Sequence, residues 1–211
     1  MTIEYASAGF FNDGEIIKNI LDIHSLPNPR ILDVTYNSGR IWKGLAKLPV
    51  KCDINPKYSV DVVSDFRFIP FRDKSFDVVV FDPPHLSIHG AAGNNEVYGD
   101  FYGINTFYTS GRDGLNVIPM FLPLLLEVKR ILVTDGILIS KISDTINANR
   151  YHWQHVAFIN LALQLEMTPC DMLVKIRNTK RISSNWKKVR HFRKNHCYWM
   201  VVRNSNKCER P

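Results

Sequence analysis

The stretch FDVVVFDPPH (residues 76–85) joins a short apolar run to an acid, two prolines and a histidine. A continuous apolar run of this length is typical of a central strand that is covered on both faces. The two prolines fix the backbone after the strand and lack N–H donors, so nearby carbonyl oxygens stay available as acceptors. Asp82 adds a side-chain acceptor. We therefore expect Asp82, Pro83 and Pro84 to receive an exocyclic NH₂ group, with the ring of His85 stacked on the base that carries it.

Around this stretch, apolar segments alternate between strand-like and helix-like spacing. Short apolar runs predict further strands over residues 30–34, 50–54, 60–64, 137–142, 172–176 and 198–202. Helical spacing predicts helices over residues 10–24 (capped by Asp13), 39–47, 118–132 and 153–165. This alternation predicts a Rossmann-like α/β fold: a mostly parallel seven-stranded sheet with helices on both faces and an antiparallel last strand. We expect a single domain over residues 1–211, with an N-terminal helical segment at residues 1–29.

Composition excludes several classes of protein. A hydrophobic content of 45% and an aromatic content of 11% exclude a disordered or low-complexity chain. The longest apolar run, residues 117–126, is short and contains two prolines, so we expect no membrane span. The N-terminus lacks the pattern of a signal peptide, and the four cysteines show no paired spacing. We therefore expect a cytoplasmic protein with reduced thiols.

The net charge of +7 is concentrated in one segment. Residues 175–194 contain nine of the 27 basic residues and no acid, so the rest of the chain has 18 bases and 20 acids. Such a patch is typical of a site for a polyanion, most often nucleic acid; the alternative is a solvated hairpin that maintains solubility. We expect a basic hairpin at residues 177–195, and we expect all nine bases of residues 175–194 to face water or phosphate. Its expected substrate contacts are Trp186, Lys187, Lys188, Arg190 and Arg193.

Acids also follow three other strands of the predicted sheet. Asp33 begins a turn of small residues (33–39), where backbone N–H groups can approach a ligand. Asp53 lies twenty residues later, the spacing at which a carboxylate binds a ribose diol, and Asp65 precedes Phe66, which can pack against a purine. Because ligands of open α/β sheets bind at the carboxyl ends of strands, these acids predict an adenosine-type ligand. The alternative is that each acid only caps its turn.

A long segment, residues 86–116, has no sustained hydrophobic period. It contains six glycines and five tyrosine or phenylalanine residues. Long loops in compact domains are usually functional, so we expect a substrate loop. Its candidate substrate contacts are Tyr98, Tyr102 and Tyr108, although aromatic residues here can equally fill the space above the sheet.

The chain resembles the class I S-adenosylmethionine-dependent amino-methyltransferases with a (D/N)PP(Y/F/W/H) motif. It is similar to small stand-alone phage, prophage and prokaryotic DNA methyltransferases that modify adenine N6 or cytosine N4. The resemblance covers most of the chain and includes the motif at residues 82–85, SFDVV at 75–79, and EVKRIL at 127–132 followed by Asp135-Gly136. It departs from the usual pattern at Asn37, where many relatives have glycine, and at His85, where tyrosine is commoner.

This resemblance implies a methyltransferase that uses S-adenosyl-L-methionine to methylate the exocyclic amine of a nucleic-acid base. The favoured target is adenine N6 in DNA. The resemblance also implies a catalytic motif of Asp82, Pro83, Pro84 and His85. The implied cofactor contacts are Asp33, Thr35, Tyr36, Asn37, Gly39, Asp53, Ile54, Asp65 and Phe66.

Several alternatives stay open. They are cytosine N4 in DNA, an amine of an RNA base, and a catalytically degenerate nucleic-acid-binding subunit of a methyltransferase complex. The expected partner is nucleic acid, with DNA favoured over RNA; a partner subunit or a homodimer is also open. We expect no metal, because the histidines have no acid or cysteine at ligand spacing.

Overall fold

The computed structural model describes residues 5–84, 117–147, 150–177, 192 and 194–205. The sheet strands are β1 (Ala8–Gly9), β2 (Ile31–Asp33), β3 (Val50–Asp53), β4 (Val62–Val63), β5 (Phe76–Phe81), β6 (Leu132–Ile142), β9 (Thr168–Ile176) and β10 (His196–Arg203). A separate antiparallel hairpin consists of β7 (Thr145–Asn147) and β8 (Arg150–His152). The helices are α1 (Asp13–Ile23), α3 (Ile118–Ile131) and α4 (Gln154–Gln164), with a 3₁₀ turn, η1 (Arg40–Trp42).

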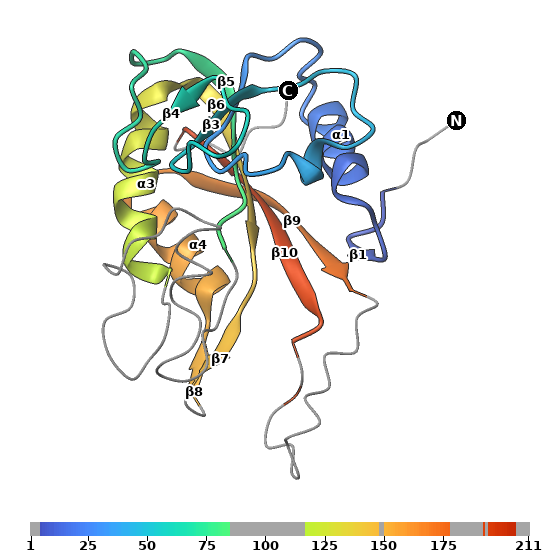
Figure 1. The fold of residues 1–211 in the computed structure, drawn as a ribbon. Coiled ribbons are helices and arrows are strands. Elements are labelled where there is room, and N and C mark those ends of the chain that lie inside the picture. Colours follow the sequence, from blue (N-terminus) through green and yellow to red (C-terminus); the bar gives the residue numbers. More distant parts are fainter. Residues whose placement is uncertain (1–4, 85–116, 148–149, 178–191, 193, 206–211) are drawn as a thin grey trace.

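The eight strands have the order β1-β9-β10-β6-β5-β2-β3-β4 (Figure 1). The strands from β6 through β4 in this order pair in parallel, and β10 is antiparallel to both β6 and β9. The mostly parallel sheet and its antiparallel last strand are therefore confirmed. The sheet has eight strands rather than seven because the two-residue β1 pairs with β9 at the edge.

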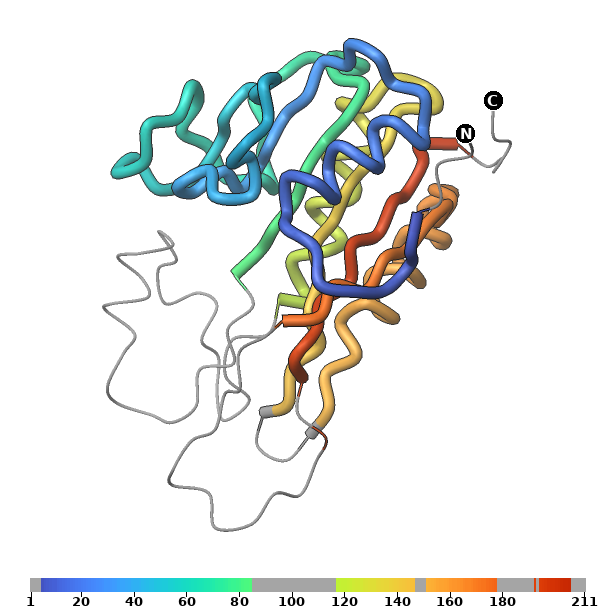
Figure 2. Tube along the Cα trace, turned by 90° about the vertical axis from the view of Figure 1, so that its right-hand side faces the viewer, coloured from blue at the N-terminus to red at the C-terminus, as the bar shows by residue number. Residues whose placement is uncertain are grey.

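Helices cover both faces of the sheet, as Figures 1 and 2 show from two directions. On one face, α1 and η1 pack against Val78 and Val80 of β5. On the other face, α3 and α4 pack against Val79 and Phe81. All four of these side chains are completely buried. The continuous apolar run of β5 is thus explained by burial on both faces, as predicted.

Two local predictions were wrong. The helix α1 is capped by Asn12, whose side chain accepts from the backbone N–H of Glu15, so Asp13 is the first helical residue and not the cap. The helix expected over residues 39–47 is only the three-residue η1. It ends early because the backbone is extended at Lys43 and left-handed at Gly44 (φ 87°).

The carboxyl ends of the parallel strands lie at one edge of the sheet. At this edge β6 extends past β5, because Phe81 at the end of β5 pairs with Ser140 while β6 continues to Ile142 (Figure 2). The chain then enters the β7–β8 hairpin. The residues that follow β5 therefore lie beside β6, which pairs on its other side with β10, and those that follow β2, β3 and β4 lie successively farther along the same edge.

Candidate functional site

Asp33 ends β2 and is completely buried. The indole Nε1 of Trp42 donates to its Oδ2 at 2.6 Å, and the backbone N–H of Thr35 donates to Oδ1 at 2.9 Å. Burial raises the pKa of Asp33 to about 7, although these two hydrogen bonds act in the opposite direction. The carboxylate therefore points inward and organises the turn that follows β2.

Asp53 ends β3 and joins two neighbouring turns. Its Oδ2 accepts from the backbone N–H of Asn37 at 2.8 Å, and its Oδ1 accepts from that of Asn55 at 2.8 Å. Burial raises the pKa of this carboxyl as well. Within the first turn, Gly39 has φ 65°, and a side chain there would overlap the ring of Tyr36. The structure thus brings the turn after β2 into contact with Asp53.

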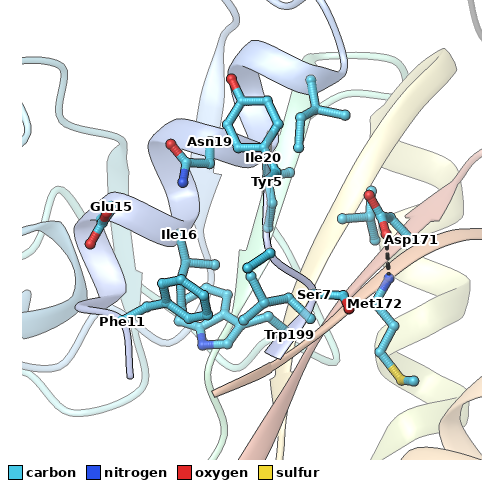
Figure 3. A pocket seen from close by; sticks show the side chains of 14 residues that line it. Tyr5, Ser7, Phe11, Glu15, Ile16, Asn19, Ile20, Asp171, Met172 and Trp199 are labelled. Atoms are coloured by element: carbon cyan, nitrogen blue, oxygen red, sulfur yellow. Dashed lines mark hydrogen bonds between the residues drawn. The ribbon is translucent and has the colours of Figure 1, made fainter. Parts of the chain in front are cut away.

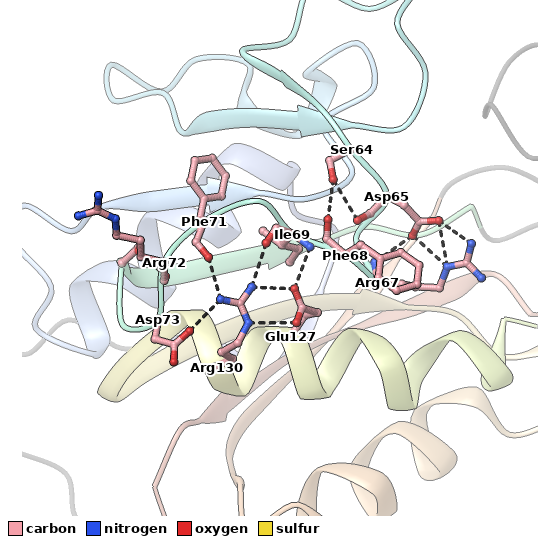
Figure 4. Close-up of polar contacts among 11 residues, drawn as sticks. Ser64, Asp65, Arg67, Phe68, Ile69, Phe71, Arg72, Asp73, Glu127 and Arg130 are labelled. Carbon is pink, nitrogen blue, oxygen red and sulfur yellow. Dashed lines mark hydrogen bonds and ion pairs between the residues drawn. The ribbon is translucent and has the colours of Figure 1, made fainter.

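Asp65 follows β4 and is bound by a residue of its own turn. Arg67 donates through Nε to both carboxylate oxygens, at 3.0 and 2.9 Å, and its backbone N–H donates to Oδ1 at 2.9 Å (Figure 4). Phe66, also expected at the cofactor site, packs its ring edge-on against Phe81 with centroids 5.3 Å apart. The acid and the aromatic ring are adjacent, but the guanidinium group of Arg67 already donates hydrogen bonds to the carboxylate of Asp65.

The segment after Asp65 is anchored to α3 by two residues whose role the sequence analysis did not identify. Glu127 accepts from the backbone N–H of Ile69 at 2.8 Å (Figure 4). Arg130 donates to the carbonyl oxygens of Ile69 and Phe71 at 2.9 and 2.7 Å, and it also pairs with Asp73. Hydrogen bonds from Arg130 to Glu127 and Asp73 raise its pKa further, so it stays charged. A glutamate three residues before an arginine was the available sequence signal.

Asp82 directly follows β5. Its backbone N–H donates to Oγ1 of Thr35 at 2.8 Å, which connects the end of β5 to the turn after β2. Its carboxylate accepts from Nζ of Lys141 at 3.0 Å. Pro83 is buried and Pro84 is half-buried. The expected cluster of acceptors therefore has a cationic donor beside it, which no motif in the sequence indicated.

A second polar cluster lies beyond the end of β5. The buried carboxylate of Asp144 is 2.7 Å from Nδ1 of His155, whose ring stacks on Tyr198 with centroids 4.1 Å apart. Nζ of Lys194 is 3.6 Å from Asp144 and 4.8 Å from the ring centroid of Trp153. Trp153 is exposed. This cluster presents an aromatic and basic surface at the carboxyl edge that the sequence analysis missed.

The two ends of the basic segment are bound within the fold. Nζ of Lys175 is 2.6 Å from Asp13, Nη2 of Arg177 donates to Ser143 at 3.1 Å, and Lys194 pairs with Asp144. The prediction that all nine bases face water or phosphate was therefore wrong for these three. Their partners come from α1 and from the end of β6, so only the three-dimensional arrangement could identify them.

All of the expected substrate contacts lie outside the described residues, as do His85 of the expected catalytic motif and the expected substrate loop at residues 86–116. These substrate contacts are Tyr98, Tyr102, Tyr108, Trp186, Lys187, Lys188, Arg190 and Arg193. Among the residues that the structure describes, no three His, Cys, Asp or Glu side chains are grouped to hold a metal ion. In that same part of the chain, no helix combines the length and the apolar character needed to cross a membrane.

A cavity of about 260 Å³ lies between the N-terminal segment, α1 and the strands β9 and β10 (Figure 3). Its walls come from the N-terminal segment, α1, β9 and β10, and include Tyr5, Ile16, Met172 and Trp199. The lining is mostly apolar and includes neither Asp82 nor any of the expected cofactor contacts. This cavity is therefore separate from the site at the carboxyl edge.

No known protein-family profile and no curated protein sequence matches the chain. Solved structures do match it. A SAM-dependent methyltransferase from Methanosarcina mazei aligns with a TM-score of 0.55 and 15% identity over 91% of this chain and 98% of that chain. The 1,6-didemethyltoxoflavin-N1-methyltransferase of Burkholderia thailandensis, solved with S-adenosylhomocysteine, aligns with a TM-score of 0.54 and 13% identity over 92% and 78%. The chain thus has the fold of S-adenosylmethionine-dependent methyltransferases, which confirms the expected fold.

Proposed function

We propose that this protein is a methyltransferase that transfers the methyl group of S-adenosylmethionine to an exocyclic amine of a nucleic-acid base. Adenine N6 in DNA is the first candidate target. The observation that carries the proposal is the position of Asp82-Pro83-Pro84, directly after the central strand β5 and linked to the turn after β2 through Thr35. A methyl donor held by that turn and an amine held by Asp82 would be neighbours.

The residues at the ends of β2, β3 and β4 fit the cofactor. In the described part of the chain, the side-chain hydrogen bonds to Asp33 and Asp53 all come from uncharged N–H groups. A ligand that carries a sulfonium and an ammonium group would stabilise the ionised form of these acids, so such a ligand is favoured at this position. Asp53 would bind the ribose hydroxyls, and Asp65 with Phe66 would bind the adenine. When bound, the cofactor supplies an already activated methyl group.

The acceptor side fits a neutral amine. The carboxylate of Asp82 and the carbonyl oxygen of Pro83 would accept the two protons of the NH₂ group. These contacts orient the nitrogen lone pair toward the methyl group, and they stabilise the positive charge that develops on nitrogen during transfer. A base within a duplex must leave the stack to reach this position, and aromatic surfaces favour that step. The exposed ring of Trp153 at the same edge is one such surface.

The nucleic-acid partner is supported by the basic segment. Its ends are held beside the carboxyl edge by the contacts of Lys175 and Lys194. The bases between these ends, Lys187, Lys188, Arg190 and Arg193, are proposed to contact phosphates. Contacts of this kind act on DNA and RNA alike, so the choice between the two depends on the base pocket.

The proposal is tested by incubating the protein with cofactor labelled in its methyl group, together with DNA or RNA. We expect label in one nucleic acid with wild-type protein and, in the same time, about a hundredth as much or less with Asp82→Ala. Replacing Lys187, Lys188, Arg190 and Arg193 by serine should weaken nucleic-acid binding uniformly across sequences. It should also flatten the slope of log affinity against log salt by about 0.7–0.9 for each lost phosphate contact. Label in neither nucleic acid, with cofactor bound, would exclude the proposed substrate class.

A further inference from the structure

Lys141 lies beside Asp82 because of the strand register. It is the penultimate residue of β6, one position after Ser140, which pairs with Phe81. On its other side it pairs with Trp199 of β10, and its Nζ is 5.5 Å from the centre of that indole ring. Its side chain is only 12% exposed. A lysine that is so nearly buried requires negative partners to remain charged.

Two carboxylates supply the negative charge that keeps Lys141 charged. Nζ of Lys141 is 3.0 Å from Oδ2 of Asp82 and 3.2 Å from Oδ2 of Asp13, the first residue of α1. Burial lowers the pKa of Lys141, but the charges of Asp82 and Asp13 outweigh it, so the net effect is a raised pKa. Asp13 also pairs with Lys175 at 2.6 Å. The four side chains alternate in sign and carry no net charge together.

These contacts hold Asp82 at two points. Its backbone N–H is bound to Thr35 at 2.8 Å, and its carboxylate is bound to Lys141 at 3.0 Å. The first contact places the residue next to the proposed cofactor turn. The second selects one orientation of the carboxylate among those that the side-chain torsion angles allow. Orientation matters here because a preorganised acceptor lowers the barrier only when it points at the group on which charge develops.

We infer that Lys141 is a positioning residue that fixes the Asp82 carboxylate for the acceptor amine; the inference rests on the proposed function. Lys141 does not itself take the amine proton, because its charged ammonium group has donors but no acceptor. Its effect on the reaction passes through Asp82. The role of Asp13 is to hold Lys141 from the side of α1, so that the lysine does not move with Asp82.

The test compares Lys141→Met, Lys141→Arg and Lys129→Met in the full-length protein. Lys129→Met is the control because it removes a partly buried lysine of α3 that pairs with Glu166 at 3.6 Å and contacts neither Asp82 nor Asp13. With saturating cofactor and nucleic acid, Lys141→Met should lower kcat by about ten- to a hundred-fold, since small misplacements of a reacting group have effects of that size. The Kd of the cofactor should stay at its wild-type value. Lys141→Arg should restore most of the lost kcat, and Lys129→Met should keep kcat close to wild type.

A double variant distinguishes an effect of Lys141 on Asp82 from a loss of kcat that arises only because Lys141→Met folds poorly. Asp82→Ala combined with Lys141→Met removes both charges together, so neither is left buried alone. If Lys141 acts through Asp82, the double variant should have the same kcat as Asp82→Ala. Additive losses, or a kcat in Lys141→Met within about three-fold of an active wild type, would overturn the inference. An inactive wild type would instead overturn the proposed function.

Discussion

The two halves of the carboxyl edge hold their acids in different ways. After β2 and β3, Asp33 and Asp53 are bound by uncharged indole and backbone N–H groups. After β5 and at the start of α1, Asp82 and Asp13 are bound by lysine ammonium groups. Accordingly, burial raises the pKa of Asp33 to about 7, whereas the carboxylates around Lys141 raise the pKa of that lysine against its burial.

This difference matches the charges of the two proposed ligands. The cofactor is cationic at its sulfonium and amino groups, so carboxylates without a cationic partner attract it. The acceptor is a neutral amine on a polyanion. A carboxylate whose charge is balanced by Lys141 can accept a hydrogen bond without repelling the neighbouring phosphates. Under the proposed function, one edge of the sheet therefore contains a charged half for the donor and a neutral half for the acceptor.

The variant with the largest expected effect tests whether the two halves of the carboxyl edge act separately. Asp82→Ala should lower the rate of methyl transfer by about 10²–10³, because an oriented electrostatic partner at a reacting centre contributes that much. The Kd for the cofactor should remain unchanged, because Asp82 lies on the acceptor half. Single-turnover rates and calorimetric titration measure the two quantities. An equal loss in both would show that the halves do not act separately.

The converse change is Asp53→Ala. It removes the acceptor for the ribose hydroxyls, and each hydrogen bond to a charged group contributes about 1.5–3 kcal/mol. Cofactor affinity should therefore fall by about ten-fold or more, and the rate at saturating cofactor should stay close to wild type. Asp53→Asn serves as the control because it keeps the shape of the side chain. Unchanged affinity in the alanine variant would place the ribose elsewhere.

The pH dependence of stability tests the raised pKa of Asp33, which is buried and bound by uncharged N–H groups. Its pKa is about 7 in the folded protein and about 3.8 in the unfolded chain, so between these values only the folded state retains the proton. Its contribution to the free energy of unfolding therefore falls as the pH rises from about 4 to about 7, and is constant above that.

Between about pH 5.5 and about pH 7.5 the loss from this group is on the order of 2 kcal/mol. Denaturant titrations of wild type and Asp33→Asn measure it, because the asparagine cannot ionise. The wild type should lose stability over this range relative to the variant. Parallel pH profiles would contradict a raised pKa at Asp33.

The smallest expected effect concerns Arg67, which binds Asp65 with its side chain partly exposed. Partly exposed ion pairs contribute about 1 kcal/mol or less, so Arg67→Ala should raise cofactor affinity by no more than about five-fold. Arg72→Ala, a change on the same segment, is the control. A lower affinity in Arg67→Ala would mean that Arg67 supports the cofactor site and does not compete for Asp65.

The sequence predicted those parts of the fold that depend on local pattern. The bounds of β5 were predicted correctly because both of its faces are buried. The helical spacing of α3 and α4 was visible because one face of each helix packs on the core. The helix predicted over residues 39–47 was wrong because left-handed glycines at both ends limit η1 to one short turn. The β7–β8 hairpin was not predicted, because its strands have too few residues to show a hydrophobic period.

For the site, the sequence indicated the acids but not their partners. Asp33, Asp53 and Asp82 follow strands, so local order was enough to find them. Lys141 reaches Asp82 only through the pairing of β5 with β6, across 59 positions of the chain. Trp42 binds Asp33 only because the turn folds back on itself. Contacts of this kind depend on register and burial, and one sequence without its fold does not specify them.

The most direct test of the central claim is to identify the atom that receives the methyl group. Wild type and Asp82→Ala are incubated with deuterium-labelled cofactor and with DNA or RNA, and the digested nucleosides are analysed by mass spectrometry. The account predicts labelled methyl on an exocyclic amine with wild type, with N6-methyldeoxyadenosine as the favoured product, and about a hundredth as much or less with the variant. Label on a ring nitrogen, a ring carbon or a sugar hydroxyl, or equal label with both proteins, would contradict it.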